Sequence, residues 1–166
     1  RVDKTKVEAL SRAEKPYNMK SLKRFMGAAA FMLRYVFRFA HRTSNMRRLL
    51  RKDQKFVWDD NCDSEYRDIL DALTNTPVLG FYQQGLPTYL YVDSSLSSAG
   101  YCLTQVFPEG EKPICFGSKS LNVHEMRYPA THRECLALVY ALLKEHALLA
   151  GQQVVCRTDC QALVSL

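Results

Sequence analysis

The sequence predicts an α/β fold in which a helix crosses a mixed sheet, preceded by a small, mainly helical segment. Three runs between residues 88 and 118 show the apolar alternation of strands. A helical pattern follows at 131–151, where Gly151 ends it, and another strand-like run lies at 153–159. A short linker through Gly85 and Pro87 leads us to expect two domains, a helical one at 1–84 and a sheet domain at 85–166.

The N-terminal segment begins with a Pro turn and continues as one or two amphipathic helices. Its apolar residues recur at helical spacing, at Leu22, Phe25, Met26, Ala29, Met32, Leu33, Val36 and Phe39. On the other side, Arg34, Arg38 and Arg42 recur every four residues, so a continuous helix would align them in one basic stripe. Such a stripe could follow a phosphate backbone or simply face water.

A second helix is expected after residue 58. Either Asp59 or Asp60 can cap its N-terminus, and Thr76-Pro77 would end it. One face gathers the apolar residues Cys62, Tyr66, Ile69, Leu70 and Leu73.

The C-terminal part contains the predicted sheet. Strands are expected at 88–93, 99–107 and 113–118, with a turn at 108–112 joining the last two. The helix at 131–151 would pack one apolar side on the sheet, formed by Leu136, Leu138, Val139, Leu142 and Leu143. Three antiparallel strands, a helix and a further strand at 153–159 make a mixed sheet.

Charge is distributed unevenly along the chain. Of 23 Lys and Arg residues, 16 lie in residues 1–55, which hold only 4 of the 17 Asp and Glu residues. A basic arm favours a polyanion as partner, although a solvated basic surface explains the same counts. The six cysteines show no disulfide-like spacing and no signal-like segment precedes them, so we expect core thiols in an intracellular protein, cytoplasmic or nuclear. The longest apolar run, at 25–33, is far shorter than the roughly 20 residues of a membrane span.

Three acidic residues lie at matching points of the predicted sheet. Asp93 ends the first strand, Glu134 lies near the start of the crossing helix, and Asp159 ends the fourth strand. Each alone could be a turn or cap residue. Together they suit a site for two divalent cations about 3.5–4 Å apart that assist phosphodiester hydrolysis.

Several segments in order along the chain resemble the Gypsy type of retroelement reverse transcriptase. "KSLKRFMGAAAFMLRYVFRFA" and "FVWDDNCDSEYRDILDALTNTPVL" are similar to its thumb or connection region. "YVDSSLSSAGYCLTQ", "PICFGSKSLNVHEMRYPATHRECLALVYAL" and "TDCQAL" are similar to its ribonuclease H domain. The family usually has Ala at position 94 and often His at position 160, where this chain has Ser and Cys.

The resemblance implies a ribonuclease H-like fold and a metal-dependent endonuclease in the full-length parent. It assigns Asp93, Glu134 and Asp159 as ligands of Mg²⁺ or Mn²⁺, while the small Ser94 and Ser95 leave room for a nucleic-acid backbone. The expected substrate is the RNA strand of an RNA–DNA hybrid, recognised by shape and 2′-hydroxyl groups. The rest of a Pol polyprotein, or a host protein, would be a partner.

Two expectations concern the ends of the chain. It stops at Leu166, before the family's fourth acidic residue and its remaining elements, so the resemblance implies a domain incomplete at its C-terminus. The aspartates of the polymerase would lie upstream of Arg1, so polymerase activity of this chain is not predicted.

Two alternatives stay open. The chain could keep the fold as a catalytically inactive module that binds nucleic acid or protein. His132, Cys135, Cys156 and Cys160 could also form a zinc site, although their spacing matches no standard zinc knuckle.

Overall fold

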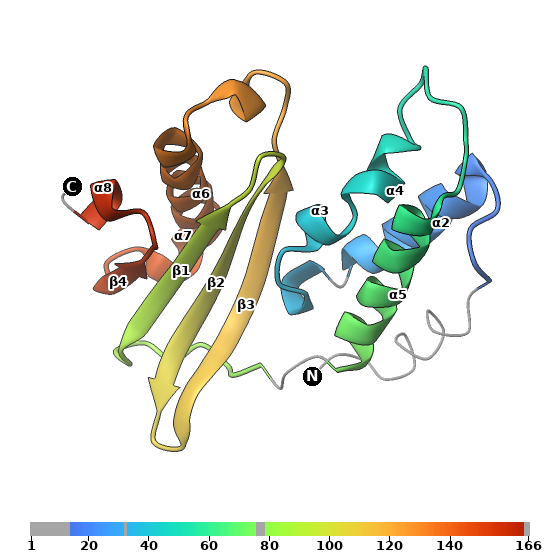
Figure 1. Ribbon diagram of the computed structural model, residues 1–166. Helices are drawn as coiled ribbons and strands as arrows, with labels where there is room; N and C mark the ends of the chain where they lie inside the picture. The colour runs from blue at the N-terminus through green and yellow to red at the C-terminus, as the bar shows by residue number, and fades with distance from the viewer. Residues whose placement is uncertain (1–13, 32, 76–78, 165–166) are drawn as a thin grey trace.

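A four-stranded mixed sheet lies between two groups of helices in the computed structural model, which describes residues 14–31, 33–75 and 79–164 (Figure 1). The strand order is β3-β2-β1-β4, and the expected strands are confirmed. Their bounds are β1 Thr88–Ser94, β2 Ser98–Phe107, β3 Gly110–Ser120 and β4 Val154–Arg157.

The strand register fixes where functional residues meet. β1 pairs antiparallel with β2, and Asp93 lies opposite Gly100. β1 pairs parallel with β4, and Tyr91 lies opposite Arg157. Residues that follow these two strands therefore emerge at the same edge of the sheet, as expected for parallel neighbours.

The crossing helix α6, Ala130–Lys144, packs on β1 and β2 through a face that differs from the predicted one. Its buried residues are Glu134, Ala137 and Ala141, whereas Val139, Leu142 and Leu143 are exposed. The prediction was therefore wrong for Val139, Leu142 and Leu143, while Leu136 and Leu138 are half-buried and pack against the core. Alanine side chains let the helix approach the sheet closely, so Ala137 and Ala141 lie innermost. The helical pattern is also interrupted at Glu145, after which α7, His146–Leu149, begins.

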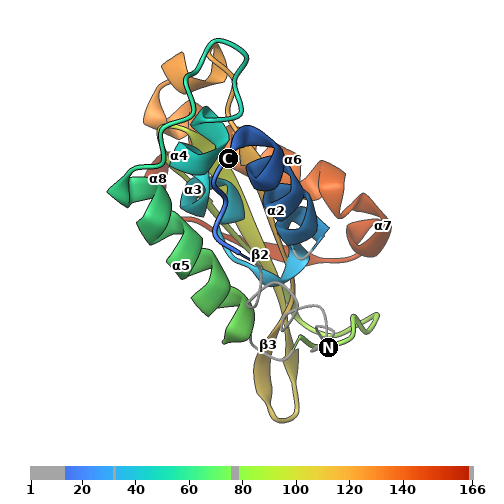
Figure 2. The ribbon, with the colours of Figure 1, turned by 90° about the vertical axis from the view of Figure 1, so that its right-hand side faces the viewer.

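The N-terminal part forms a bundle of short helices. They are α2 Met19–Phe31, the 3₁₀ helix η1 Leu33–Tyr35, α3 Phe39–Arg42, α4 Ser44–Arg48 and α5 Asp60–Thr74. Their shared core includes Leu22, Phe25, Phe39, Met46 and Ile69. Figure 2 views the molecule from this side and shows α2 and α5 over the sheet. Asp59 caps α5, because its carboxylate accepts a hydrogen bond from the Cys62 amide at 2.9 Å. The predicted end of this helix at Thr76-Pro77 lies outside the described residues.

The predicted basic stripe does not form. Arg34 lies in η1, Arg42 lies in α3, and Arg38 between them has φ 56° and ψ 32°, the left-handed conformation. That conformation cannot continue a right-handed helix, so the three side chains leave the backbone in different directions.

The helical bundle lies against the face of the sheet opposite α6. Phe37 and Phe116 have ring centroids 6.0 Å apart, and the Ala40 amide donates to the Ser118 hydroxyl at 2.9 Å. Coverage on both faces explains why most of β2 is buried. The boundary between domains 1–84 and 85–166 stays a prediction, and the Gly80 amide already donates to β3, to the Pro113 carbonyl, at 2.8 Å.

Three short helices complete the fold. They are η2 Glu125–Arg127, α7 and, beyond β4, α8 Gln161–Val164. Among the described residues, no helix combines the length and apolar character needed to cross a bilayer.

A candidate metal and nucleic-acid site

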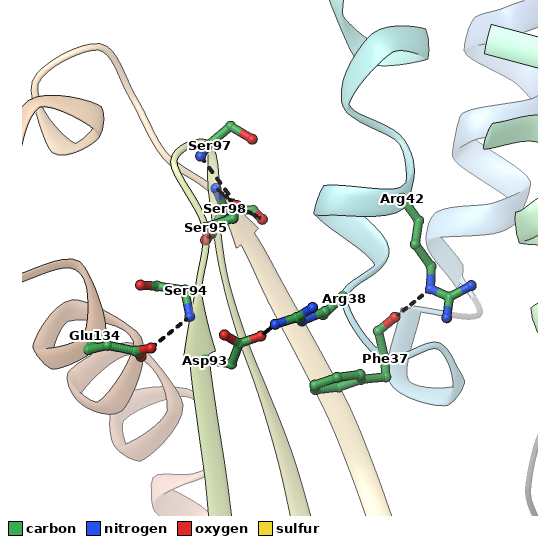
Figure 3. Close-up of polar contacts among 9 residues, drawn as sticks. All are labelled: Phe37, Arg38, Arg42, Asp93, Ser94, Ser95, Ser97, Ser98 and Glu134. Atoms are coloured by element: carbon green, nitrogen blue, oxygen red, sulfur yellow. Dashed lines mark hydrogen bonds and ion pairs between the residues drawn. The ribbon is translucent and has the colours of Figure 1, made fainter. Parts of the chain in front are cut away.

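Asp93 lies at the end of β1 and points toward the helical bundle, where Arg38 forms an ion pair with it (Figure 3). The Arg38 guanidinium also lies 5.5 Å from the centre of the Phe37 ring. Arg38 is the one residue other than glycine with positive φ in the described part of the chain. A backbone held in this unfavourable region is often found at functional sites.

Glu134 reaches the same end of the sheet from the opposite face. Its Oε1 accepts a hydrogen bond from the Ser94 amide at 3.2 Å (Figure 3). Its Oε2 is buried and has no hydrogen-bond partner. Burial raises the pKa of the Glu134 carboxyl, and the nearby Asp159 carboxyl raises this pKa further. A buried oxygen without a partner beside a second carboxylate is a place where a cation would be stabilising.

Asp159 follows β4 and lies in the segment before α8. Arg157 of β4 lies opposite Tyr91 of β1 in the parallel pair. Asp159 follows Arg157 by the same number of residues as Asp93 follows Tyr91, so both aspartates lie at the same end of the sheet. The Asp159 side chain is exposed, and it interacts with Glu134 from the sheet edge. The structure therefore brings Glu134 and Asp159 together as predicted.

Asp93, the third predicted metal ligand, forms an ion pair with Arg38 in this structure. Within residues 14–31, 33–75 and 79–164, no three His, Cys, Asp or Glu side chains are grouped so that they could hold a metal ion. The proposed zinc set is therefore not formed either. For the three carboxylates the reason is visible in Figure 3: Asp93 turns toward Arg38, whereas Glu134 turns toward the amide of Ser94.

The other predicted nucleic-acid residues make contacts within the protein. Arg34 donates to Glu145 at 2.9 Å, and Arg42 donates to Asp68 at 2.6 Å and to the Phe37 carbonyl at 3.1 Å. All three arginines of the predicted stripe are thus paired with a carboxylate.

The serines that follow Asp93 shape the β1–β2 turn. The Ser95 hydroxyl accepts from the Ser98 amide at 3.0 Å and lies 2.8 Å from the Ser98 hydroxyl. Ser94 contributes its backbone amide to Glu134. The turn therefore fixes the backbone beside the carboxylates, while the role of Ser94 and Ser95 toward nucleic acid stays a prediction.

A buried network that the sequence did not indicate connects the end of α6 to the bundle. The Tyr101 hydroxyl donates to Glu145 at 2.5 Å, and Glu145 is only 5% exposed. Burial, followed by the Glu145 carboxylate, raises the pKa of Tyr101. Arg34 supplies the positive charge of this network, so its ion pair holds the bundle to the sheet domain.

The cysteines carry less chemistry than the carboxylates. All six are free, and Cys62 and Cys115 are buried as expected for core thiols. Burial raises the pKa of both thiols to about 11, which keeps them protonated at neutral pH. Cys156 is exposed, so the expectation of a core position is wrong for this residue.

Comparison with known proteins identifies the class of this domain. Residues 58–156 match the family described as the RNase H-like domain found in reverse transcriptase. The chain belongs to this family. It is similar to the retrovirus-related Pol polyproteins from the Drosophila melanogaster transposons 412, with 23% identity over 164 residues, and opus, with 27% over 162 residues. These alignments cover 99% and 91% of the chain but only 13% and 16% of the respective polyproteins.

The same region is recognisable in three dimensions. A foamy viral protease-reverse transcriptase, solved in complex with an RNA/DNA hybrid, superposes with a TM-score of 0.78 at 17% identity, covering 94% of this chain and 21% of that one. The ribonuclease H-like α/β fold is therefore confirmed. The chain corresponds to a stretch of retroelement Pol polyproteins that carries an RNase H-like domain, which is compatible with the Gypsy-type resemblance.

Proposed function

We propose that this chain belongs to a reverse transcriptase whose RNase H-like domain cleaves the RNA strand of RNA–DNA hybrids. One observation carries the proposal: the buried, unpartnered Oε2 of Glu134 lies beside Asp159, at the edge of the sheet where Asp93 ends β1. Burial of a carboxylate oxygen without a donor costs free energy that a bound cation would offset.

The donor set suits Mg²⁺ or Mn²⁺, because both cations prefer carboxylate oxygens. When bound, such a cation would polarise the phosphodiester and lower the pKa of a water molecule. Glu134 would offer Oε2 while the Ser94 amide keeps Oε1 in place. Asp159 would be the second ligand. Asp93 would complete the site only after separating from Arg38, whose charge would then be free to meet a phosphate group.

A second function is supported by that same ion pair. With Asp93 held by Arg38 and no grouping of three possible ligands in the described residues, the domain could act as an inactive module that binds nucleic acid or protein. Arg38 and Arg42 remain our proposed contacts to nucleic acid, and the basic N-terminal part favours this partner in both cases.

Cleavage of a labelled RNA–DNA hybrid in Mg²⁺ or Mn²⁺ separates the two functions. We expect Asp93→Asn to abolish cleavage and to leave hybrid binding intact, because it removes a metal ligand and a negative charge. Asp53→Asn is a matched control, since Asp53 is exposed and far along the sequence from the three carboxylates. Cleavage that persists in Asp93→Asn would disprove the assignment. Binding without cleavage, also by the chain extended beyond Leu166, would favour the inactive module.

A further inference from the structure

We propose that a pocket between α4 and the end of β3 binds the phosphodiester backbone of a nucleic-acid strand. The pocket has a volume of about 340 Å³, within the size range of small-molecule sites. Arg47, Arg48 and Arg51 line it, together with Ser97 and Ser120. The choice of nucleic acid as ligand rests on the proposed function, which this site would extend.

Arg47 carries a positive charge that its neighbours do not neutralise. Its guanidinium donates to the hydroxyl groups of Thr43 at 3.0 Å and Ser120 at 2.9 Å, and it lies 5.7 Å from the centre of the Phe39 ring. Burial lowers the pKa of Arg47, as expected for a charge that has lost water without gaining a carboxylate. An anion in the pocket would offset this cost.

The other two arginines add charge at the mouth of the pocket. Arg48 approaches the Asp59 carboxylate only to 3.4 Å, and Asp59 is already occupied as the cap of α5. Arg51 is exposed, and its side chain has no hydrogen-bond or ion-pair partner among the described residues. No carboxylate of the described residues lines the pocket, so its charge is positive.

Two acidic residues outside the lining, Glu65 and Glu125, make contacts of their own. Glu65 accepts hydrogen bonds from the Asn45 and Met46 amides at the start of α4, each at 2.9 Å, and from the hydroxyl of Ser44, a lining residue, at 3.0 Å. Glu125 pairs with Lys119. Neither carboxylate pairs with Arg47 or Arg51, so these two positive charges stay available to a ligand.

The position of the pocket points to a polymer rather than a free anion. Ser97 and Ala40 line it, and their neighbours in sequence, Ser98 and His41, line the small cavity that contains Asp93. α4 and the β1–β2 turn lie at the same end of the sheet (Figure 1). A strand of nucleic acid carries one phosphate per about 3.4 Å of helix axis, so a strand crossing Asp93 can present another phosphate to the arginines. Their planar forks suit phosphate oxygens, and the apolar part of the lining suits a sugar.

The test is the salt dependence of hybrid binding, measured by fluorescence anisotropy in EDTA so that no cleavage occurs. The variant Arg48→Ala/Arg51→Ala removes two exposed charges. The control Lys112→Ala/Lys144→Ala removes two charges outside the basic N-terminal part, from β3 and α6. Loss of two phosphate contacts should make the slope of log K against log salt shallower by about 1.8. Between 50 and 200 mM salt, the wild type should therefore lose about tenfold more affinity than the pocket variant.

Each outcome is decisive. A shallower slope in the pocket variant, with the wild-type slope in the control, would support the site. An unchanged slope, an equal change in the control, or absence of hybrid binding by the wild type would overturn it. Because the measurement excludes metal, a protein that binds through the pocket but never cleaves would disprove only the proposed hydrolase.

Discussion

Replacing Arg38 by alanine and by glycine separates two contributions of this residue to stability. Both changes remove the ion pair with Asp93 and the contact with the Phe37 ring. Only glycine adopts φ 56° without strain. The pair of variants therefore isolates the cost of the left-handed backbone from the contribution of the side chain.

The expected magnitudes follow from exposure and backbone geometry. The side chains of Arg38 and Asp93 are 46% and 23% exposed, so the ion pair should contribute only about 0.2–1 kcal/mol. Arg38→Ala should lower the free energy of unfolding by that amount. Relative to alanine, glycine should relieve about 1–2 kcal/mol of backbone strain. It should also cost about 0.4–1 kcal/mol, because the unfolded chain gains conformational freedom. Arg38→Gly should therefore be more stable than Arg38→Ala by about 0.8 kcal/mol at the centre of these ranges, and by about 1.6 kcal/mol at most.

Urea unfolding of the three proteins measures these differences. The urea midpoint of Arg38→Ala should lie below that of Arg38→Gly. The slopes of unfolding free energy against urea concentration should be similar. Equal stability of the two variants would refute the strained backbone at Arg38. Equal stability of Arg38→Ala and the wild type would refute a stabilising ion pair.

The same variants test whether Arg38 competes with a cation for Asp93. Under the proposed function, Arg38→Gly should bind Mn²⁺ up to about fivefold more tightly, since the cation no longer displaces an ion pair of up to about 1 kcal/mol. Isothermal titration calorimetry measures this affinity without activity. Adding Asp93→Asn should cancel the gain, and a gain that persists would show that Mn²⁺ binds elsewhere.

Three further changes test the interior. Glu134→Gln should be more stable than the wild type near neutral pH. Because the pKa of Glu134 is raised in the folded state, the folded protein keeps the carboxyl proton to a higher pH than the unfolded chain does. Wild-type stability therefore falls as the pH rises from the ordinary carboxyl range through that pKa. Denaturant unfolding at acidic and neutral pH measures the widening gap. Gly117→Ala should cost about 1–3 kcal/mol, because a Cβ at this position would overlap the ring of Tyr101, and a lower Tm would show it. Tyr101→Phe should cost about 1–3 kcal/mol in urea unfolding, since the buried Glu145 carboxylate would lose a hydrogen-bond donor while keeping its ion pair with Arg34.

Each of these has a contradicting result. A stability gap for Glu134→Gln that stays constant with pH would remove the titration of Glu134 as its cause. An unchanged Tm for Gly117→Ala would mean that the ring of Tyr101 can shift at no cost. If Tyr101→Phe is neutral, water satisfies Glu145 and the network does not stabilise the interface.

Short-range patterns predicted much of the fold. The alternation in 88–118 located three strands, and Asp59 capped a helix where a cap was expected, because these features depend on neighbouring residues. Periodicity was less reliable for orientation. α6 has apolar residues on more than one side, and the distance allowed between helix and sheet selected the alanine side.

By itself, the sequence determined which carboxylates lie at the end of β1, just beyond β4 and near the start of α6. Asp93, Glu134 and Asp159 reach one edge because strand direction and helix position follow from the order of the elements. Only the tertiary structure decided that Arg38 pairs with Asp93 and that Arg47 and Arg51 share a pocket. These contacts join the helical bundle to the sheet. The direction of each arginine side chain depends on the left-handed backbone at Arg38 and on packing between segments that are distant in sequence. A local sequence pattern contains neither kind of information.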